Sequence, residues 1–214
     1  MNNLKLLGLT AGVGSLILAG TASADFTGMQ YETVENGMAG LTTYLVYAGV
    51  DAGGELDAVY GDDSNTLSVS SDGGFYQHAF GGNSAPSAAL IAAFPSLAYD
   101  SFVTIGLLTS TGDAMLSIGI DYTGFEAGGS IVTDNGTWFA TPSDPQVLEI
   151  DGRVLVGQFT VGDGDHVYGS MNFQGKNSDL SNWNADGVLF DTVPAPGALA
   201  LLGLAGIAAR RRRK

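Results

Sequence analysis

The stretch RVLVGQFTVGDGDHVYGSMNFQ, residues 153–174, carries the clearest strand pattern of the chain. Apolar and β-branched residues fill 153–161 and 167–174, and the turn residues Gly162-Asp163-Gly164-Asp165 separate these two halves. In the second half, Val167, Met171 and Phe173 fall on one side of an extended chain, because side chains alternate between its two faces. The stretch therefore predicts a β-hairpin with one face toward a core.

The same pattern appears upstream, where 102–109 and 115–122 flank the turn residues Thr111-Gly112-Asp113 and predict a second hairpin. In its second strand the apolar residues share one face: Leu116, Ile118, Ile120 and Tyr122. The other face holds Ser117, Gly119 and Asp121. This period of two predicts a half-buried strand.

Turn residues recur between further short strands, which are expected at 41–50, 56–60, 66–70, 74–80, 136–140 and 187–190. Only 86–94 has a helical pattern, with Ser84 or Ser87 as its cap. Many short strands, with no internal linker or repeat, predict an all-β fold, an antiparallel sandwich or jelly roll. The expected core residues are Val103, Ile105, Leu107, Leu116, Ile118, Ile120, Val154, Val156, Val167, Met171 and Phe173.

The N-terminal residues have the three parts of a secretory signal peptide. Lys5 supplies the positive charge, 6–19 the apolar region, and Ala22-Ser23-Ala24 the small residues of a cleavage site before Asp25. The sequence thus predicts a signal-peptide helix in 1–24 and an exported domain in 25–192. A lasting N-terminal membrane helix is the alternative.

The C-terminal residues 193–214, VPAPGALALLGLAGIAARRRRK, place a short apolar run before a block of positive charge. The run 197–209 has 13 residues. As a helix it spans about 20 Å, against a hydrocarbon core of about 30 Å. The basic residues that follow would stay on the cytoplasmic side, with the preceding domain outside.

This tail resembles the PEP-CTERM sorting signal of bacterial exported proteins, in which a Pro-Glu-Pro-like motif precedes an apolar helix and an Arg-rich end. Here the motif residues are Val193, Pro194, Ala195, Pro196 and Gly197, with Ala where the family has Glu. The Arg-rich end comprises Arg210, Arg211, Arg212 and Arg213. The resemblance implies processing by an exosortase, transient anchoring in the inner membrane, and a place at an exopolysaccharide-rich cell surface. A plain C-terminal anchor is the alternative, and the central region resembles exported ectodomains that carry the same tail.

The charge of the expected exported domain is strongly negative. All 22 acidic residues lie between Asp25 and Asp191, with only Arg153 and Lys176 as basic residues there, which leaves −20 against −14 for the whole chain. Such a field repels nucleic acid and anionic lipid and attracts cations. Nucleic-acid binding is therefore excluded, and salt or divalent ions should stabilise the domain.

The chain has no cysteine, which excludes disulfides, thiol nucleophiles and zinc sites built on thiolates. A domain of about 168 residues buries enough surface to fold without them. The two histidines, His78 and His166, stand in no metal or triad motif, and no G-x-S-x-G elbow occurs.

Calcium is the cofactor that the composition favours, because Asp and Asn oxygens crowd the turns. Asp163 and Asp165 are the first choice of ligands; 62–63 and 182–187 are further candidates. The last begins like an EF-hand loop but has Val193 at its twelfth position. Ordinary turn chemistry is the alternative for all three, and no other cofactor is expected.

No catalytic residue is assigned, since the glutamates fall in expected loops or strand ends. They are Glu32, Glu35, Glu55, Glu126 and Glu149. Trp183 is the candidate for stacking on a sugar ring because its neighbours are polar, whereas Trp138 is expected in the core. The sequence thus predicts an exported surface or matrix protein with a structural or adhesive role. A carbohydrate-binding module and a glycoside-active envelope enzyme are the alternatives.

Overall fold

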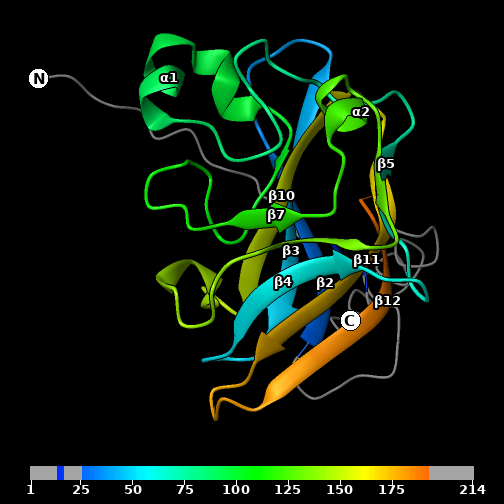
Figure 1. The fold of residues 1–214 in the computed structure, drawn as a ribbon. Helices are drawn as coiled ribbons and strands as arrows, with labels where there is room; N and C mark the ends of the chain where they lie inside the picture. The colour runs from blue at the N-terminus through cyan, green and yellow to red at the C-terminus, as the bar shows by residue number, and fades with distance from the viewer. Residues whose placement is uncertain (1–13, 17–25, 193–214) are drawn as a thin grey trace, which may run out of the picture.

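The computed structural model describes residues 14–16 and 26–192, which form two antiparallel sheets packed face to face (Figure 1). The strand order of the first sheet is β1 (Gly14–Leu16), β2 (Phe26–Val34), β3 (Leu41–Val50), β10 (Arg153–Gly162) and β6 (Phe102–Val103). The predicted all-β sandwich is confirmed, and β3 has the bounds expected from its apolar composition.

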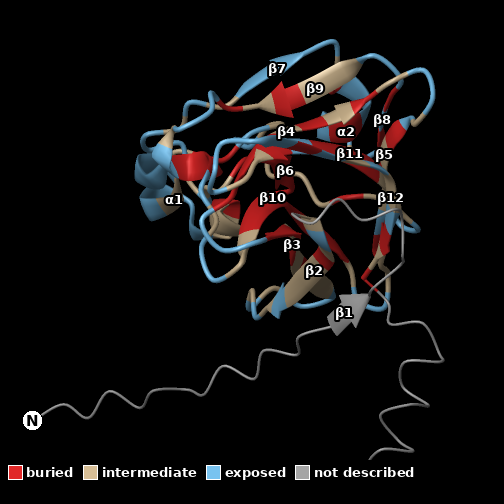
Figure 2. Cartoon of the chain, turned by 90° about the horizontal axis from the view of Figure 1, so that it is seen from below, coloured by how far each residue is buried: buried red, intermediate tan, exposed pale blue. Residues whose placement is uncertain are grey.

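The second sheet has seven strands. Its order is β7 (Leu116–Ile118), β9 (Gly136–Phe139), β4 (Glu55–Gly61), β11 (Val167–Lys176), β5 (Leu67–Ser71) and β8 (Ile131–Thr133). Strands β4 and β5 share one side of β11, and β12 (Asn182–Asp191) pairs with its other side. In Figure 2 the two sheets form separate layers with buried residues between them.

The hairpin predicted at residues 153–174 is wrong, although both of its strands exist. β10 belongs to the first sheet and β11 to the second. Both strands have other partners: β10 pairs with β3 along its length, and its other side is bonded by β6 at Gly157 and Gln158 and by the backbone of Tyr76 at Thr160. β11 pairs with β12 on one side and with β4 and β5 on the other. The turn at 162–166 therefore carries the chain from one layer to the other.

The second predicted hairpin is also wrong. Only Phe102–Val103 and Leu116–Ile118 are strands, and they lie in different sheets. Leu116 and Ile118 are 59% and 64% exposed, because β7 pairs with β9 at the rim of the second sheet, where these side chains lie on the outer face. A period of two shows that a strand has two faces, but it does not show which one is covered.

The core between the sheets contains most of the residues predicted for it. Fully or nearly buried are Val103, Ile105, Val154, Val156, Val167, Met171 and Phe173. Leu107 and Ile120 are half-buried. Large aromatic residues add to this core, including Trp138 as expected, and the ring of Phe26 from β2 stacks on Phe173 at 5.2 Å. This contact joins the two layers.

The helices are short. They are α1 (Ala88–Ala93), α2 (Thr123–Glu126) and the 3-10 helices Pro95–Tyr99 and Pro145–Val147. Ser87 takes the expected N-cap position of α1, but its side chain makes no capping hydrogen bond. The strand expected at 74–80 is absent, and β2 was not predicted.

Most residues of the two predicted signals lie outside the described ranges. The exceptions are Gly14–Leu16, which pair with β2 as a strand instead of a helix. Outside the described residues lie the cleavage residues Ala22, Ala24 and Asp25, the motif at 193–197 and the arginines at 210–213. Within the described ranges, no helix is long and apolar enough to cross a bilayer.

Candidate functional site

A β-bulge on the second sheet displaces the side chain of Asp57. In the pairing of β4 with β11, Ala58 is opposite Gln174 and Leu56 is opposite Gly175, so that Asp57 has no residue opposite it. A bulge bends its strand and re-aims side chains, and bulges are frequent beside functional sites. This one places the Asp57 side chain at a hollow on the outer face of the sheet.

The hollow is a cavity of about 320 Å³. Residues of three neighbouring strands and the following loop line it, among them Asp57, Tyr60, Thr137, Phe139, Pro142 and Gln174. Ala58 lies opposite Phe139 in β9 and opposite Gln174 in β11. Its small side chain leaves open the space between these larger neighbours.

The carboxyl of Asp57 is buried, and one of its two oxygens lacks a hydrogen bond within the described structure. The residue is 4% exposed, and its Oδ1 has no hydrogen-bond partner among the described residues. Burial and the charge of Glu55 raise the pKa of Asp57 from 3.8 to about 6, while Lys176 opposes this shift. An ionised carboxylate held in this way is a candidate to bind a ligand that donates hydrogen bonds.

Glu55 lies two residues before Asp57 and is 5% exposed. Its Oε2 accepts a hydrogen bond of 3.1 Å from the backbone N–H of Ser143, but its Oε1 has no partner in the described part of the chain. Ser143 has a φ of 70°, a left-handed conformation that is unfavourable for a residue other than glycine. The loop after β9 is thus held in a strained conformation against this carboxylate.

Tyr60 is held at the side of the cavity by a hydrogen bond. Its hydroxyl donates to Oδ1 of Asp186 in β12 at 2.5 Å. Burial, followed by this hydrogen bond, raises the pKa of Tyr60 above its usual value. Because one end of the ring is fixed, it offers a pre-oriented aromatic surface, with Phe139 from β9 as the second ring of the cavity.

Trp183, the residue predicted to stack on a sugar, is not on the surface. It is 2% exposed and lies in β12, where its ring faces Phe26 at 6.3 Å. It also covers Gly175 of β11, at which an added Cβ would lie 2.6 Å from the indole. The polar neighbours of Trp183 point outward from the same strand while its ring points into the core, so the prediction is wrong.

The predicted calcium ligands Asp163 and Asp165 have different neighbours. The Asp163 carboxylate accepts a 2.8 Å hydrogen bond from the hydroxyl of Thr42, whereas the Asp165 carboxylate faces Gly73 and Gly162. No group of three or more His, Cys, Asp or Glu side chains suited to a metal occurs in residues 26–192. Calcium binding by this loop stays a prediction.

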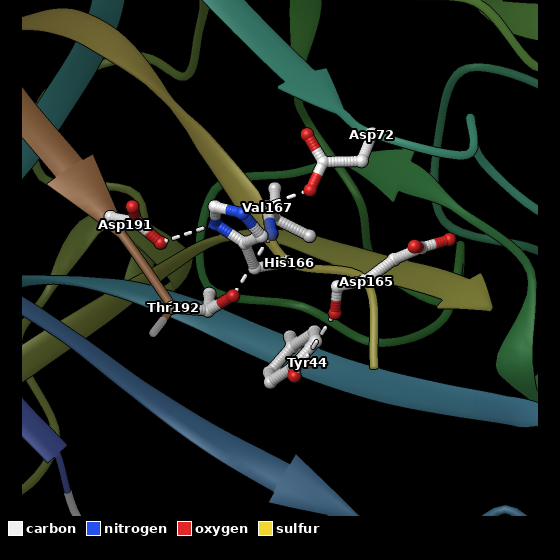
Figure 3. A network of polar contacts seen from close by, with 7 residues as sticks. All are labelled: Tyr44, Asp72, Asp165, His166, Val167, Asp191 and Thr192. Carbon is white, nitrogen blue, oxygen red and sulfur yellow. Dashed lines mark hydrogen bonds and ion pairs between the residues drawn. The ribbon is translucent and has the colours of Figure 1, made fainter. Parts of the chain in front are cut away.

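His166, which stands in no metal or triad motif, joins three strand ends (Figure 3). Its Nε2 lies 2.9 Å from Asp72, which follows β5, and its Nδ1 lies 2.7 Å from Asp191 in β12. Thr192 closes the network by accepting the N–H of Val167. These contacts are made within the protein, and they fasten the start of β11 to its neighbours.

A larger cavity of about 560 Å³ lies beside Arg153. The guanidinium lies 4.0 Å above the ring of Tyr47 and pairs with Glu32 at 2.7 Å, and the Tyr47 hydroxyl also donates to Glu32. Arg153 therefore has its charge partner in Glu32, and the carboxylate of Asp144, which also lines this cavity, accepts the backbone N–H of Gln146. The smaller cavity is the better candidate because it is lined by Asp57, which has no ion pair and whose Oδ1 has no hydrogen-bond partner among the described residues.

Comparison of the chain with protein-family profiles, with curated proteins and with solved structures gave no match.

Proposed function

We propose that this protein is an exported cell-surface protein that binds polysaccharide on the outer face of its second sheet. The observation that carries the proposal is the buried carboxyl of Asp57, whose Oδ1 has no hydrogen-bond partner among the described residues, in a cavity lined by Tyr60 and Phe139. Of the alternatives that the sequence leaves open, these groups favour a carbohydrate-binding module. Binding to matrix polysaccharide would also supply the adhesive role.

The cavity combines the two kinds of contact that a sugar ring needs. Aromatic rings present flat apolar surface, while carboxylate and amide groups fix the orientation of a ligand through hydrogen bonds. Asp57 supplies an acceptor, and Gln174 and Thr137 add an amide and a hydroxyl. The site is built on strands, which hold such groups more firmly than loops do.

The proposed location rests on the two ends of the sequence. The residues before Asp25 have the pattern of a signal peptide, and those after Thr192 resemble a PEP-CTERM signal. Export, cleavage by signal peptidase and sorting by an exosortase would bring the domain into contact with exopolysaccharide. The strong negative charge of residues 25–192 is compatible with such a solvated surface location.

A glycan array probed with the purified full-length chain tests this function. The variants Tyr60→Ala and Phe139→Ala should each weaken binding of any captured glycan about tenfold, since an aromatic contact contributes about 0.5–1.5 kcal/mol beyond its buried area. Tyr168→Ala is the matched control, because Tyr168 is an exposed tyrosine of the same sheet that does not line the cavity.

Unchanged binding in both cavity variants would place the glycan elsewhere and refute the proposal. Equal loss in the Tyr168 variant would do the same. Release of shorter sugars from a captured glycan would mean that the site hydrolyses the glycan instead of only binding it.

A further inference from the structure

We propose that the polysaccharide bound at this cavity carries free amino groups, so that a ligand ammonium is received by the carboxyl of Asp57, which lines the cavity and feels the negative charge of the nearby Glu55. This inference rests on the proposed function and names the chemical class of its ligand. It predicts that an amino sugar binds in preference to its N-acetylated counterpart and to sugars with carboxylates.

The two carboxyls lack what an ammonium would provide. One oxygen of each, Oδ1 of Asp57 and Oε1 of Glu55, has no hydrogen-bond donor among the described residues. Within residues 26–192 the ion pairs are those of Arg153 with Glu32 and of His166 with Asp72 and Asp191. A protonated amine has three N–H donors and a full positive charge, so in the cavity it can donate to the carboxyl of Asp57 and offset the negative charge of Asp57 and Glu55 together.

Among the described residues, Lys176 is the basic side chain that acts on the charge of Asp57. It lies opposite Glu55 in the register of β4 and β11, and its charge opposes the rise in the pKa of Asp57. It forms no ion pair with either carboxyl in the described structure. The charge of the two carboxyls is thus only partly balanced by Lys176, and an ammonium that enters the cavity beside Asp57 would compete with it.

The remaining features of the cavity favour the same chemistry. Tyr60 and Phe139 present ring faces, which attract cations as well as sugar rings. The charge of −20 on residues 25–191 concentrates cationic ligands near the surface and repels polysaccharides that carry carboxylates. An N-acetylated sugar keeps the ring but has no charge to offer to the two buried carboxyls.

Calorimetric titration of the full-length chain at pH 6.5 tests the inference with two probes of equal length. One is an oligomer of glucosamine and the other the same oligomer of N-acetylglucosamine. The glucosamine oligomer should bind at least about tenfold more tightly, since a hydrogen bond to a charged group is stronger than a neutral one. Its affinity should fall with added salt, because the attraction is partly screened.

Three variants separate the site from the general acidity of the protein. Asp57→Asn should lower the affinity for the glucosamine oligomer about tenfold or more. Glu35→Gln is the matched control, because it removes the same charge from an exposed residue after β2 in the other sheet and should change little. Lys176→Gln removes the competing cation and should strengthen binding.

The outcomes distinguish this inference from the proposed function. Equal binding of both oligomers, weakened by Tyr60→Ala but not by Asp57→Asn, would refute the ammonium while leaving the glycan site in place. Equal loss in the Asp57 and Glu35 variants would mean unspecific attraction to the acidic surface and would also overturn the inference. If no glycan of any class binds, the proposed function fails with it.

Discussion

Replacing Asp57 by Asn should change the stability of the protein in a way that depends on pH. The folded protein binds a proton at Asp57 with a pKa of about 6, whereas the ordinary value is 3.8. At pH 7 both states are ionised, and the folded state carries the whole cost of the buried charge. At about 1.4 kcal/mol for each pH unit between these two pKa values, the cost is at most about 3 kcal/mol, and solvent that screens the charge lowers it.

The sign follows from proton linkage. Because the pKa is raised in the folded state, the folded protein takes up a proton first as the pH falls from about 6 toward 4. The cost of the buried charge on Asp57 in the wild type therefore decreases over this pH range, and little of this cost is left at pH 4. An asparagine at position 57 carries no charge, so the cost of burying it is the same at pH 7 and at pH 4.

The measurement is the difference in the free energy of unfolding between Asp57→Asn and the wild type, from urea titrations at pH 7 and pH 4. This difference should favour the variant by about 2–3 kcal/mol more at pH 7 than at pH 4. In thermal scans this corresponds to roughly 4–10 °C for a chain of this size. The exposed control Glu35→Gln should show no such change. The same difference at both pH values would refute the account of a buried, ionised Asp57.

Other measurements test the fold, the turn at Asp163 and the two ends. Ile118→Ala should cost less than about 0.5 kcal/mol of stability, because Ile118 is exposed on β7, whereas Ile105→Ala in the core should cost about 2–5 kcal/mol; comparable costs would contradict the placement of β7. Calcium at about 10 mM should stabilise the protein more than sodium at matched ionic strength, by about 1.4 kcal/mol for a dissociation constant of about 1 mM. That excess should vanish when Asp163 and Asp165 are both changed to Asn, and a surviving excess would move the site elsewhere. Mass spectrometry of the protein from cells with an exosortase should find a mature N-terminus at Asp25 and a processed C-terminus; an intact tail would favour a plain anchor.

The strands could be located from the sequence better than their partners. Residues 41–50 and 153–161 are long apolar runs, and each forms a strand because such a run fits a sheet that is covered on one or both faces. Strand pairing depends instead on contacts between distant residues. The turn at 162–165 has the composition of a hairpin, yet β10 pairs with β3 on one side, and β6 and the backbone of Tyr76 bond to it on the other.

The direction of side chains could be predicted only in part. In β12, Asn182, Asn184 and Asp186 alternate with Trp183 and Ala185, so the period of two that places the indole in the core is present in the sequence. The turn-like composition of this segment concealed the pattern. Leu116 and Ile118 show the opposite error, since their alternation is real but faces solvent.

The carboxyl pair of the candidate site could not have been found in this way. Leu56–Tyr60 was predicted as a strand, but the position of Asp57 depends on a bulge that exists only in the register between β4 and β11. Glu55 was assigned to a strand end, where solvent exposure is the usual expectation. Its burial depends on the loop that carries Ser143, which folds back over it from 88 positions away in the sequence.

The energetics of the Asp57–Glu55 pair connect this local geometry to binding. An ionised carboxyl without a donor destabilises the fold that contains it, and the strained φ of Ser143 adds to that cost. Within the described structure this cost is offset only in part, by the charge of Lys176 and by the hydrogen bond from the backbone of Ser143 to Glu55. Structural carboxyls are normally paired, whereas binding sites hold polar groups ready for a partner that arrives from outside. A bound ligand ammonium would neutralise the buried charge and so remove its cost. The free energy that the buried charge costs the free protein would then add to the affinity for the ligand.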